Sequence, residues 1–388
     1  MTYRQFSRAR RPSLAPQRTG VIRNGSRGTV LETYPLRWVY AEGVKPLPGE
    51  DLEHIFNHTV PLWNPIGGRR FFISGGTGFF GAWLLESLIY CNRQLRLNLS
   101  ATVLTRNPDA FRTKMPHLAV DPAIELLRGD VRDFVFPDAG FDFVLHGAVS
   151  TSADAASKPG ELLSTLIHGT ERVLELAQTR GTRKFLLVSS GAVYGKQPGH
   201  LTHIPETYLG GPDWLDANAA YGEGKRISEQ ICWLAASESG FDLAIARCFA
   251  FVGPHLPLDQ HFAIGNFIAD ALAGRNIAVR GDGTAMRSYL YAADLAIWLW
   301  TILLEKNESP QTFAVNVGSG EAISIGELAQ LVVDELNPSL EVEIAQKPLP
   351  GALRAQYVPD VRRAESIFGL RPAISLRKAI CRTAQWYR

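Results

Sequence analysis

The stretch SGGTGFFG, residues 74–81, decides the fold of this chain. It stands between the apolar run RRFFIS (69–74), which has the pattern of a buried strand, and a helical pattern over residues 80–92. Glycines here allow a tight turn, let the backbone approach a pyrophosphate, and leave the helix N-terminus facing that anion. Four glycines satisfy the GxxGxxG or the GxGxxG spacing: Gly75, Gly76, Gly78 and Gly81. Because the pattern joins a strand to a helix, it predicts a dinucleotide site rather than only a tight turn.

Apolar runs and helical patterns alternate as far as about residue 249. The runs typical of strands cover residues 69–74, 101–106, 141–148, 184–190 and 242–249. The helical patterns cover residues 80–92, 160–178 and 219–239. Strands that are apolar throughout and alternate with helices indicate a parallel sheet covered on both faces. The predicted fold class is therefore α/β, a Rossmann-type doubly wound parallel sheet.

The alternation loosens after about Pro254. Helical patterns and short strand patterns mix in the C-terminal third, at residues 262–274, 277–280, 291–304, 323–337 and 341–345. This mixture predicts a smaller α/β C-terminal substrate lobe. We expect three parts: an N-terminal extension (1–68), a Rossmann domain that binds NAD(P) (69–254), and a substrate-binding lobe (255–388) that is interleaved with the Rossmann domain.

The N-terminal extension is basic at its start and has no apolar region typical of a secretory signal, so we expect a polar tail. Its stretch DLEHIFNHTVPLW (51–63) has helical periodicity and is expected to pack on the main domain.

Composition narrows the class of protein. Hydrophobic residues make up 46% of the 388 residues and charged residues 20%, which is ordinary for a globular protein with a core. The net charge of +2 gives no argument for a nucleic-acid or membrane partner, and no apolar run approaches the roughly 20 residues of a membrane helix. Four cysteines lack metal-ligand or redox spacing, so we expect reduced thiols, no metal site and a cytoplasmic location: Cys91, Cys232, Cys248 and Cys381.

The choice of dinucleotide depends on the end of the second expected strand. NAD sites usually have an acid there, but this strand ends at Arg106, which suits a 2′-phosphate. NADP is therefore slightly favoured over NAD, although Arg106 could also be a solvated strand end. In GDVRD (129–133), Asp130 and Val131 could flank an adenine, or could form a plain turn at the strand exit.

A tyrosine and a lysine form a YxxxK pair in YGEGK (221–225), at the start of an expected helix. Residues four apart share one helix face, so Tyr221 and Lys225 should be neighbours. An ammonium beside a phenol favours the phenolate and lowers the phenol pKa from its usual value of about 10. Tyr221 is thus a candidate general base for a sugar hydroxyl.

Five motifs occur in order at suitable spacings: SGGTGFFG (74–81), GDVRD (129–133), VSSGAVYG (188–195), YGEGK (221–225) and RSYLYAADLA (287–296). With them the chain, over roughly residues 69–388, resembles the extended short-chain dehydrogenase/reductase family, in its nucleotide-sugar epimerase/dehydratase branch. The resemblance implies a catalytic set of Ser190, Tyr221 and Lys225. It implies cofactor contacts at Gly75, Thr77, Gly78, Phe79, Phe80, Gly81, Arg106, Asp130, Val131, Ala148, Tyr221 and Lys225.

The same resemblance implies substrate contacts. Arg287 would grip the sugar-nucleotide pyrophosphate, unless it forms a surface ion pair. Arg354 and Asn266 match a second phosphate contact and an asparagine near the nucleotide. Ser150 and Thr151 follow a strand end that faces the site. Together with the catalytic serine, the expected substrate-binding set is Ser150, Thr151, Ser190, Asn266, Arg287 and Arg354.

Departures from the family pattern bear on the reaction. An Asp-Glu pair follows the hydroxyl of the family's 4,6-dehydratases, and UDP-glucuronate decarboxylases keep the Glu, whereas this chain has Gly191 and Ala192. Neither residue can transfer a proton, although an acid from elsewhere could substitute. Two family asparagines are also replaced, by Ala250 and Leu166.

These departures favour a 4-epimerase that oxidises a sugar C4 hydroxyl to a transient 4-keto intermediate. An NADPH-dependent 4-keto-sugar-nucleotide reductase is the alternative, and a UDP-glucuronate decarboxylase or 4,6-dehydratase is less favoured. A hypothesis of a different class is a catalytically silent dinucleotide-binding sensor. The expected partners are a nucleotide-sugar substrate and, by resemblance alone, a second copy of the chain in a homodimer.

Overall fold

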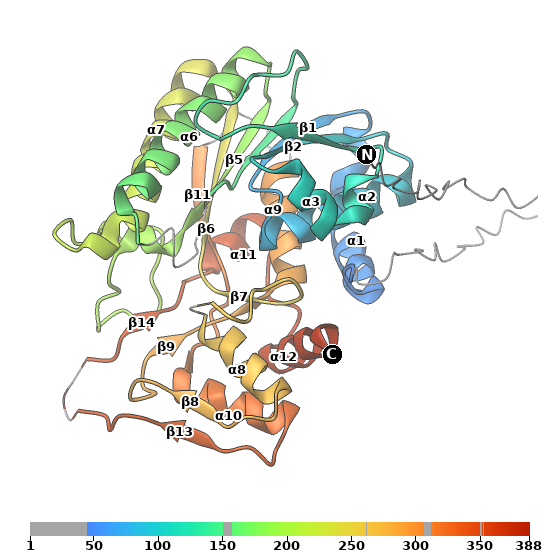
Figure 1. Ribbon diagram of the computed structural model, residues 1–388. Coiled ribbons are helices and arrows are strands. Elements are labelled where there is room, and N and C mark those ends of the chain that lie inside the picture. Colours follow the sequence, from blue (N-terminus) through green and yellow to red (C-terminus); the bar gives the residue numbers. More distant parts are fainter. Residues whose placement is uncertain (1–44, 150–156, 261, 306–311, 350, 352) are drawn as a thin grey trace, which may run out of the picture. The chain divides into compact units, whose positions relative to one another are not determined.

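A seven-stranded sheet forms the centre of the computed structural model, which describes residues 45–149, 157–260, 262–305, 312–349, 351 and 353–388 (Figure 1). The strands in sequence order are β1 (Arg70–Ser74), β2 (Ser100–Thr105), β3 (Ile124–Arg128), β4 (Phe143–His146), β5 (Lys184–Ser190), β6 (Asp242–Cys248) and β11 (Thr312–Val317). Their spatial order is β11-β6-β5-β4-β1-β2-β3, and every pair is parallel. The predicted fold class is confirmed.

The strand order reverses direction between β1 and β4. Ligands of doubly wound sheets bind in the crevice at such a reversal, beyond the carboxyl ends of the strands. The residues that follow β1, β4 and β5 are therefore the ones that the sheet brings to a common site.

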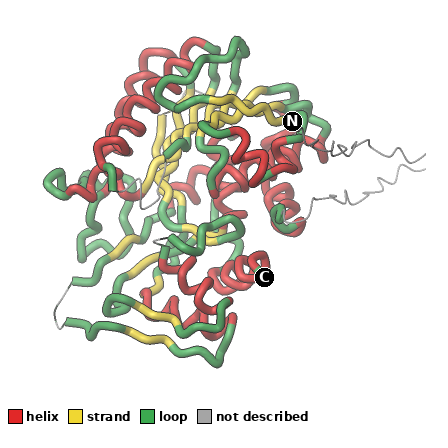
Figure 2. The backbone as a smooth tube through the Cα atoms, in the orientation of Figure 1, coloured by secondary structure: helices red, strands yellow, loops and turns green. Residues whose placement is uncertain are grey.

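Helices cover both faces of this sheet (Figures 1 and 2). On one side α6 (Pro159–Thr179) packs beside α7 (Ala220–Ser239). On the other, α2 (Phe79–Leu95), α9 (Ala292–Leu304) and α1 (Gly49–Trp63) pack on one another. Neighbouring residues of a strand point to opposite faces. Accordingly, Phe71 of β1 contacts Trp300 of α9, whereas Phe72 contacts Phe134 and Phe141 on the other face.

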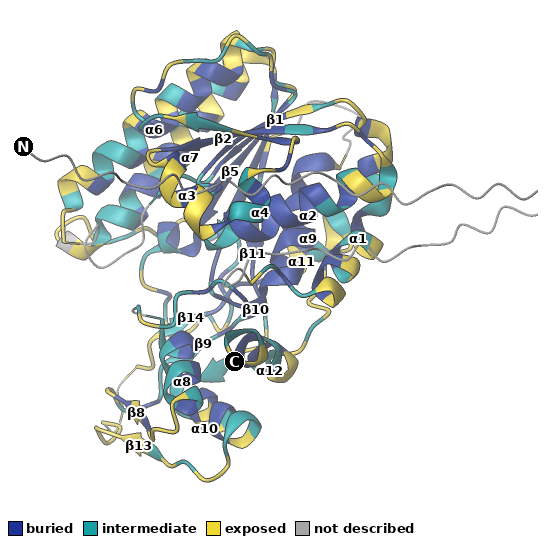
Figure 3. Cartoon of the chain, turned by 45° about the vertical axis from the view of Figure 1, so that its right-hand side comes forward, coloured by how far each residue is buried: buried dark blue, intermediate teal, exposed yellow. Residues whose placement is uncertain are grey.

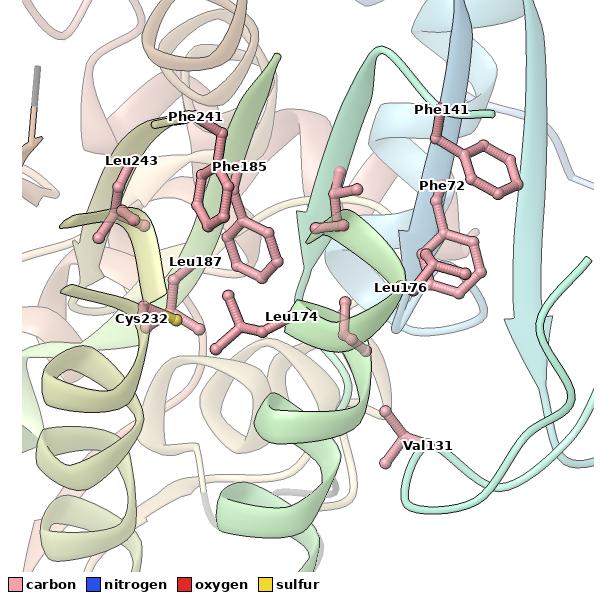
Figure 4. Packing of buried hydrophobic residues seen from close by; sticks show 14 of the residues in the cluster. Phe72, Val131, Phe141, Leu174, Leu176, Phe185, Leu187, Cys232, Phe241 and Leu243 are labelled. Atoms are coloured by element: carbon pink, nitrogen blue, oxygen red, sulfur yellow. The ribbon is translucent and has the colours of Figure 1, made fainter. Parts of the chain in front are cut away.

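The core beneath α6 and α7 consists almost entirely of apolar side chains from the sheet and from these two helices (Figure 4). Phe185 and Leu187 of β5 are completely buried there, and Leu174 and Cys232 pack against them from the helices. The burial pattern in Figure 3 shows the same alternation, with buried strands between half-exposed helices. This packing sets the direction in which β5 delivers its last residues.

Helix α1 confirms the helical prediction for residues 51–63 and their packing on the main domain. The buried carboxylate of Asp51 accepts a hydrogen bond from the Tyr291 hydroxyl (2.6 Å) and pairs with Arg382 of α12 (Leu376–Tyr387) (2.5 Å). An unpaired buried carboxylate would be costly, so these two partners hold α1 in place. At its far end, Trp63 packs edge-on against Trp300 (4.9 Å between ring centroids).

The C-terminal third contributes to more than one sheet. Helices α8 (Ala263–Leu272) and α10 (Ile325–Leu336) pack with the strand pair β8 (Ile277–Val279) and β13 (Val342–Ile344). A three-stranded sheet joins β12 (Ile323–Ser324), β9 (Met286–Arg287) and β14 (Gln356–Tyr357), and β10 (Leu290–Tyr291) pairs with β7 (Phe251–Val252). Two elements of this C-terminal third belong to the main domain instead: β11 is the edge strand of the seven-stranded sheet, and α9 packs on that sheet. The division into parts at residues 68 and 254 stays a proposal.

The remaining elements are short: η1 (Asn64–Ile66), α3 (Pro108–Lys114), α4 (Pro116–Ala119), η2 (Gly191–Tyr194), η3 (Ala217–Ala219) and α11 (Arg362–Phe368). All four cysteines are free thiols. Across the described part of the chain, no helix has the length and apolar character that spanning a bilayer would require. The same residues contain no cluster of His, Cys, Asp and Glu suited to a metal ion.

Candidate active site

The glycine loop between β1 and α2 is packed too tightly for side chains at two of its positions. Gly75 has a φ of +80°, and a Cβ on it would stand 2.5 Å from the carbonyl oxygen of Gly147, in the loop that follows β4. A Cβ on Gly81 would overlap the backbone of Gly76. These contacts bring the ends of β1 and β4 together beneath the N-terminus of α2, whose N-cap is Gly78. The loop therefore fits the close approach of a pyrophosphate that its spacing predicted.

A cavity of about 540 Å³ opens beside this loop. Several of the expected cofactor residues line it: Gly75, Thr77, Gly78, Arg106, Asp130, Val131 and Ala148. The other expected residues of the loop, Phe79, Phe80 and Gly81, do not line this cavity. Phe79 and Phe80 contact each other, Phe80 also packs edge-on against Phe251 (5.1 Å), and Gly81 is buried. The size and the glycine floor of the cavity fit part of a dinucleotide.

The carboxylate that was expected to flank an adenine, that of Asp130, already has a charged partner. The Asp130 carboxylate pairs with Arg132 (2.8 Å to Nε and 3.0 Å to Nη2), and this pairing holds the pKa of Asp130 below its usual range. Arg106 is exposed at the end of β2, and Lys114 of α3 lines the same cavity. Sequence reasoning missed Lys114 because the seven-residue helix α3 was not expected. Its signal was Asn107, whose side chain caps that helix.

The catalytic set comes from two elements. Ser190 is the last residue of β5, and its hydroxyl oxygen accepts a hydrogen bond from the Ala192 backbone N–H (3.1 Å). Tyr221 stands in the first turn of α7, close enough to Ser190 for the serine hydroxyl to lower the pKa of its phenol. Lys225 is buried one turn further on, where its ammonium donates to the Val188 carbonyl oxygen (2.6 Å). The end of β5 and the first turns of α7 thus bring the three residues to one place.

The expected lowering of the Tyr221 pKa is wrong for this arrangement. Burial raises the pKa of Tyr221 to about 12, and the hydrogen bond from Ser190 opposes this rise only in part. The Lys225 ammonium binds a carbonyl of β5 instead of the phenol, so it does not supply the expected stabilisation of a phenolate. Burial also lowers the pKa of Lys225, to about 8.

A second tyrosine, which sequence reasoning missed, lies near the same serine. The ring of Tyr357 of β14 packs against Phe249 (4.7 Å between centroids), and burial raises the pKa of its phenol while the nearby Ser190 hydroxyl opposes this rise in part. No motif spacing ties residue 357 to residue 190, because β14 reaches the site only by pairing with β9. The one available signal was its place in the segment that also carries Arg354.

Residues 191 and 192 occupy the positions of the Asp-Glu pair of the 4,6-dehydratases, and the first of them has no free space for a side chain. A Cβ on Gly191 would lie 2.6 Å from the Phe249 ring, so any side chain there requires that ring to move. Ala192 follows in η2 and has no proton to transfer. The structure thus supplies a physical reason for the missing acid at residue 191.

An ion pair between Glu229 and Arg247 holds the end of β5 through Ser189. Glu229 of α7 accepts hydrogen bonds from the Ser189 hydroxyl (2.5 Å) and from Arg247 (2.6 Å), and Arg247 also donates to the Tyr194 hydroxyl (3.0 Å). Because Ser189 precedes Ser190, this network fixes the strand end that carries the catalytic hydroxyl. A buried pair of this kind is costly to break, since one partner is left uncompensated.

Of the remaining expected substrate residues, Arg287 is brought near Ser190 by its pairing in register with Tyr357. Arg287 lies half-buried on β9, and its guanidinium donates to the Met286 carbonyl (2.8 Å). Arg354 is exposed, and Asn266 is half-buried in α8. Ser150 and Thr151 lie outside the described residues.

Comparison with known proteins agrees with this geometry. The family model described as the NAD dependent epimerase/dehydratase family matches residues 71–318. UDP-glucuronic acid decarboxylase 5 of Arabidopsis thaliana is 30% identical over 312 residues, covering 80% of this chain and 87% of that protein. UDP-glucuronic acid decarboxylase 1 of Xenopus tropicalis is 27% identical, covering 87% of this chain and 77% of the relative.

Solved structures resemble the fold. UDP-glucose 4-epimerase of Thermotoga maritima superposes with a TM-score of 0.68 at 21% identity, covering 82% of this chain and 98% of the other. UDP-glucuronic acid 4-epimerase of Bacillus cereus, in complex with UDP-glucuronic acid and NAD, superposes with a TM-score of 0.68 at 21% identity and the same coverage.

Proposed function

Because this chain belongs to the NAD-dependent epimerase/dehydratase family, we propose that it is a nucleotide-sugar 4-epimerase that oxidises and re-reduces the sugar C4 position. The observation that carries this proposal is the placement of Ser190 at the end of β5 beside Tyr221 at the start of α7, with Gly191 and Ala192 in place of acids. Such a site can accept a hydroxyl proton and stabilise the oxygen, but lacks the usual groups for eliminating water.

The chain's own residues have distinct roles in this proposal. When bound, the oxidised nicotinamide supplies the hydride acceptor and a positive charge. Tyr221, as phenolate, takes the proton of the C4 hydroxyl, so that the O–H bond breaks as the phenol O–H forms. Ser190 holds the C4 oxygen. Lys225 joins the start of α7 to the end of β5 through its hydrogen bond to the Val188 carbonyl oxygen. The strand end and the first turn of α7 place both hydroxyls before the substrate arrives, which lowers the entropic cost of the reaction.

The cofactor and products released by the purified protein test this proposal. An epimerase recycles its cofactor within one turnover, so denaturation should release NAD or NADP that co-purified with the protein. Incubation with UDP-glucose and with UDP-glucuronic acid should then give a C4 epimer without net cofactor consumption, as read by chromatography and NMR. Stoichiometric NADPH consumption on a 4-keto sugar nucleotide would instead establish the reductase.

Decarboxylation is the second candidate, because the curated relatives reported above are UDP-glucuronic acid decarboxylases. Against it stands Ala192, at the place where the decarboxylases keep a Glu. Conversion of UDP-glucuronic acid to a UDP-pentose with release of carbon dioxide would establish this reaction and overturn the epimerase.

We further propose that NADP is preferred over NAD. Arg106 and Lys114 both line the cavity beside the glycine loop, where they suit a 2′-phosphate. Arg106→Glu should weaken NADP binding by about 10- to 100-fold, since a hydrogen bond to a charged group contributes about 1.5–3 kcal/mol. NAD binding should change little. Calorimetric titration with both dinucleotides measures the effect.

Arg112→Glu is the matched control for that substitution. It makes the same charge change on the exposed side of α3, where Arg112 pairs with Asp109 outside the cavity lining. An equal loss of NADP affinity in both variants would assign the effect to general electrostatics and contradict a 2′-phosphate contact at Arg106.

A homodimer in the cytoplasm, with no nucleic-acid or membrane partner, completes the proposal. Ile227 and Leu234 lie seven residues apart on α7, so they share one face of the helix, and they are 39% and 47% exposed. Apolar residues exposed together on a long helix favour burial against a second copy of α6 and α7.

A further inference from the structure

A buried histidine stands beside the glycine loop and has no role in the chemistry proposed above. His146 is the last residue of β4 and pairs in register with Ser74, the last residue of β1. Its Nδ1 atom lies 2.7 Å from the Ser74 hydroxyl oxygen, and its Nε2 atom lies 3.1 Å from the hydroxyl oxygen of Thr170 in α6. All three side chains are buried. The ring therefore joins the ends of two strands to a helix.

The Thr170 hydroxyl decides which nitrogen of the ring carries the proton. Its oxygen lies 2.6 Å from the Leu166 carbonyl oxygen, and a carbonyl only accepts, so the single proton of Thr170 points to Leu166. Toward His146 the same hydroxyl must accept, and the proton between them belongs to Nε2. In a neutral ring Nδ1 is then an acceptor, and it receives the proton of the Ser74 hydroxyl.

The surroundings keep this ring neutral. Burial and the nearby Lys225 ammonium lower the pKa of His146 to about 3. That ammonium is held on the Val188 carbonyl, next to the residue of β5 that pairs with His146. The hydrogen bonds oppose protonation as well, because a charged ring donates from both nitrogens and would leave the Ser74 proton without its acceptor.

The Ser74 oxygen accepts hydrogen bonds on its other side. The backbone N–H groups of Gly147 and Ala148 both lie 3.3 Å from it, and that of Gly147 also donates to the Ser74 carbonyl oxygen (3.0 Å). Ala148 lines the cavity beside the glycine loop, as does Gly75, which follows Ser74 in the chain. The direction of the Ser74 hydroxyl therefore helps to set the distance between these two parts of the cavity wall.

We propose that His146 is a positioning residue for the dinucleotide, a neutral ring with its proton on Nε2 that aims the Ser74 hydroxyl. The oxygen of Ser74 then holds the backbone of Gly147 and Ala148 against the glycine loop. Thr170 anchors the ring to α6, and the Ser228 hydroxyl of α7 lies 3.1 Å from that of Thr170. The inference goes beyond the proposed function, because it concerns the dinucleotide site and applies to each reaction considered above.

The position of the ring proton can be measured in the wild-type protein. With nitrogen-labelled histidine, long-range proton–nitrogen NMR spectra separate a ring nitrogen that carries a proton from one that accepts. The His146 signal is the one that is missing in His146→Asn or that moves in Thr170→Val. We expect the proton on Nε2 and no titration between about pH 8 and about pH 5, where an ordinary histidine titrates. A proton on Nδ1, or a ring that titrates in this range, overturns the inference.

Two substitutions of nearly equal shape separate positioning from simple packing. His146→Asn keeps an acceptor oxygen at the place of Nδ1, whereas His146→Leu has none. We expect His146→Leu to weaken binding of NAD and NADP by about 5- to 10-fold, the effect of one lost neutral hydrogen bond, and His146→Asn by less than about 2-fold. Packing alone predicts the reverse order, since a buried place tolerates leucine better than an amide. Calorimetric titration measures both, and an Asn variant that binds no more tightly than the Leu variant overturns the inference.

Ser74→Ala tests the other end of the same hydrogen bond. It should weaken dinucleotide binding about as much as His146→Leu, and the double variant should lose little more than either single variant. Ser87→Ala is the matched control, because Ser87 is a buried serine of α2 whose hydroxyl donates to the Trp83 carbonyl and accepts from Trp300. Losses that add in the double variant, or an equal loss in Ser87→Ala, overturn the inference. These readouts are spectra and binding, so they remain decisive if the proposed reaction is wrong.

Discussion

Tyr221→Phe is expected to lower turnover by about 10²–10⁴-fold, the usual contribution of a general acid–base group. The substitution removes one oxygen, so the proton-accepting group is lost while the ring and the start of α7 remain. Nucleotide-sugar affinity should be largely kept. Steady-state kinetics together with calorimetric binding separates the two effects.

The pH dependence of turnover adds a check on this assignment. Burial raises the pKa of Tyr221 to about 12, so the phenolate is a minor species at neutral pH in the cofactor-free protein. Raising the pH increases the phenolate fraction, and kcat/KM should therefore rise with pH through the neutral range. Tyr90→Phe, on α2 and outside the site, is the matched control. Near-normal turnover of Tyr221→Phe would remove the catalytic assignment.

Gly81→Ala is expected to abolish retention of the dinucleotide and to lower the free energy of unfolding by about 1–3 kcal/mol, the usual cost of overpacking. The added Cβ would overlap the backbone of Gly76, and backbone cannot turn aside as a side chain can. The first turn of α2 would have to move away from the loop. Thermal unfolding and the dinucleotide content of the purified protein measure both effects.

Gly160→Ala is the control for this substitution. It lies in the first turn of α6, where a Cβ has nothing within 4 Å. Alanine is also the better helix former, so this variant should be as stable as the wild type. A Gly81→Ala protein that keeps both its dinucleotide and its melting temperature would contradict the packing argument.

Much of the fold could be predicted because its signals are local. The glycine spacing of residues 75–81 describes one turn and the first turn of a helix, and the YxxxK pair of Tyr221 and Lys225 lies within a single helix turn. Apolar runs such as KFLLVSS (184–190) are strands in the structure at the expected residues. The strand β11 was missed because residues 312–317 follow a helix in the loosened C-terminal pattern.

The site was predicted less completely than the fold. The proximity of Tyr221 and Lys225 along the helix suggested a lowered phenol pKa, but burial and the Val188 carbonyl oppose that effect. Side-chain orientation and desolvation depend on every element around a group, and a spacing of four residues reports neither. Similarly, the pairing of Asp130 with Arg132 could not be read from GDVRD alone.

The sequence by itself determined the family, the doubly wound sheet, the glycine loop and the strand end that carries Ser190, because each depends on residues that are close neighbours along the chain. Only the tertiary structure decided that Phe249 covers Gly191 and that Tyr357 packs on the same Phe249 ring. These contacts join segments that are far apart in the sequence. They form because parallel pairing and core packing bring strand ends to one edge of the sheet, and no local spacing encodes that meeting.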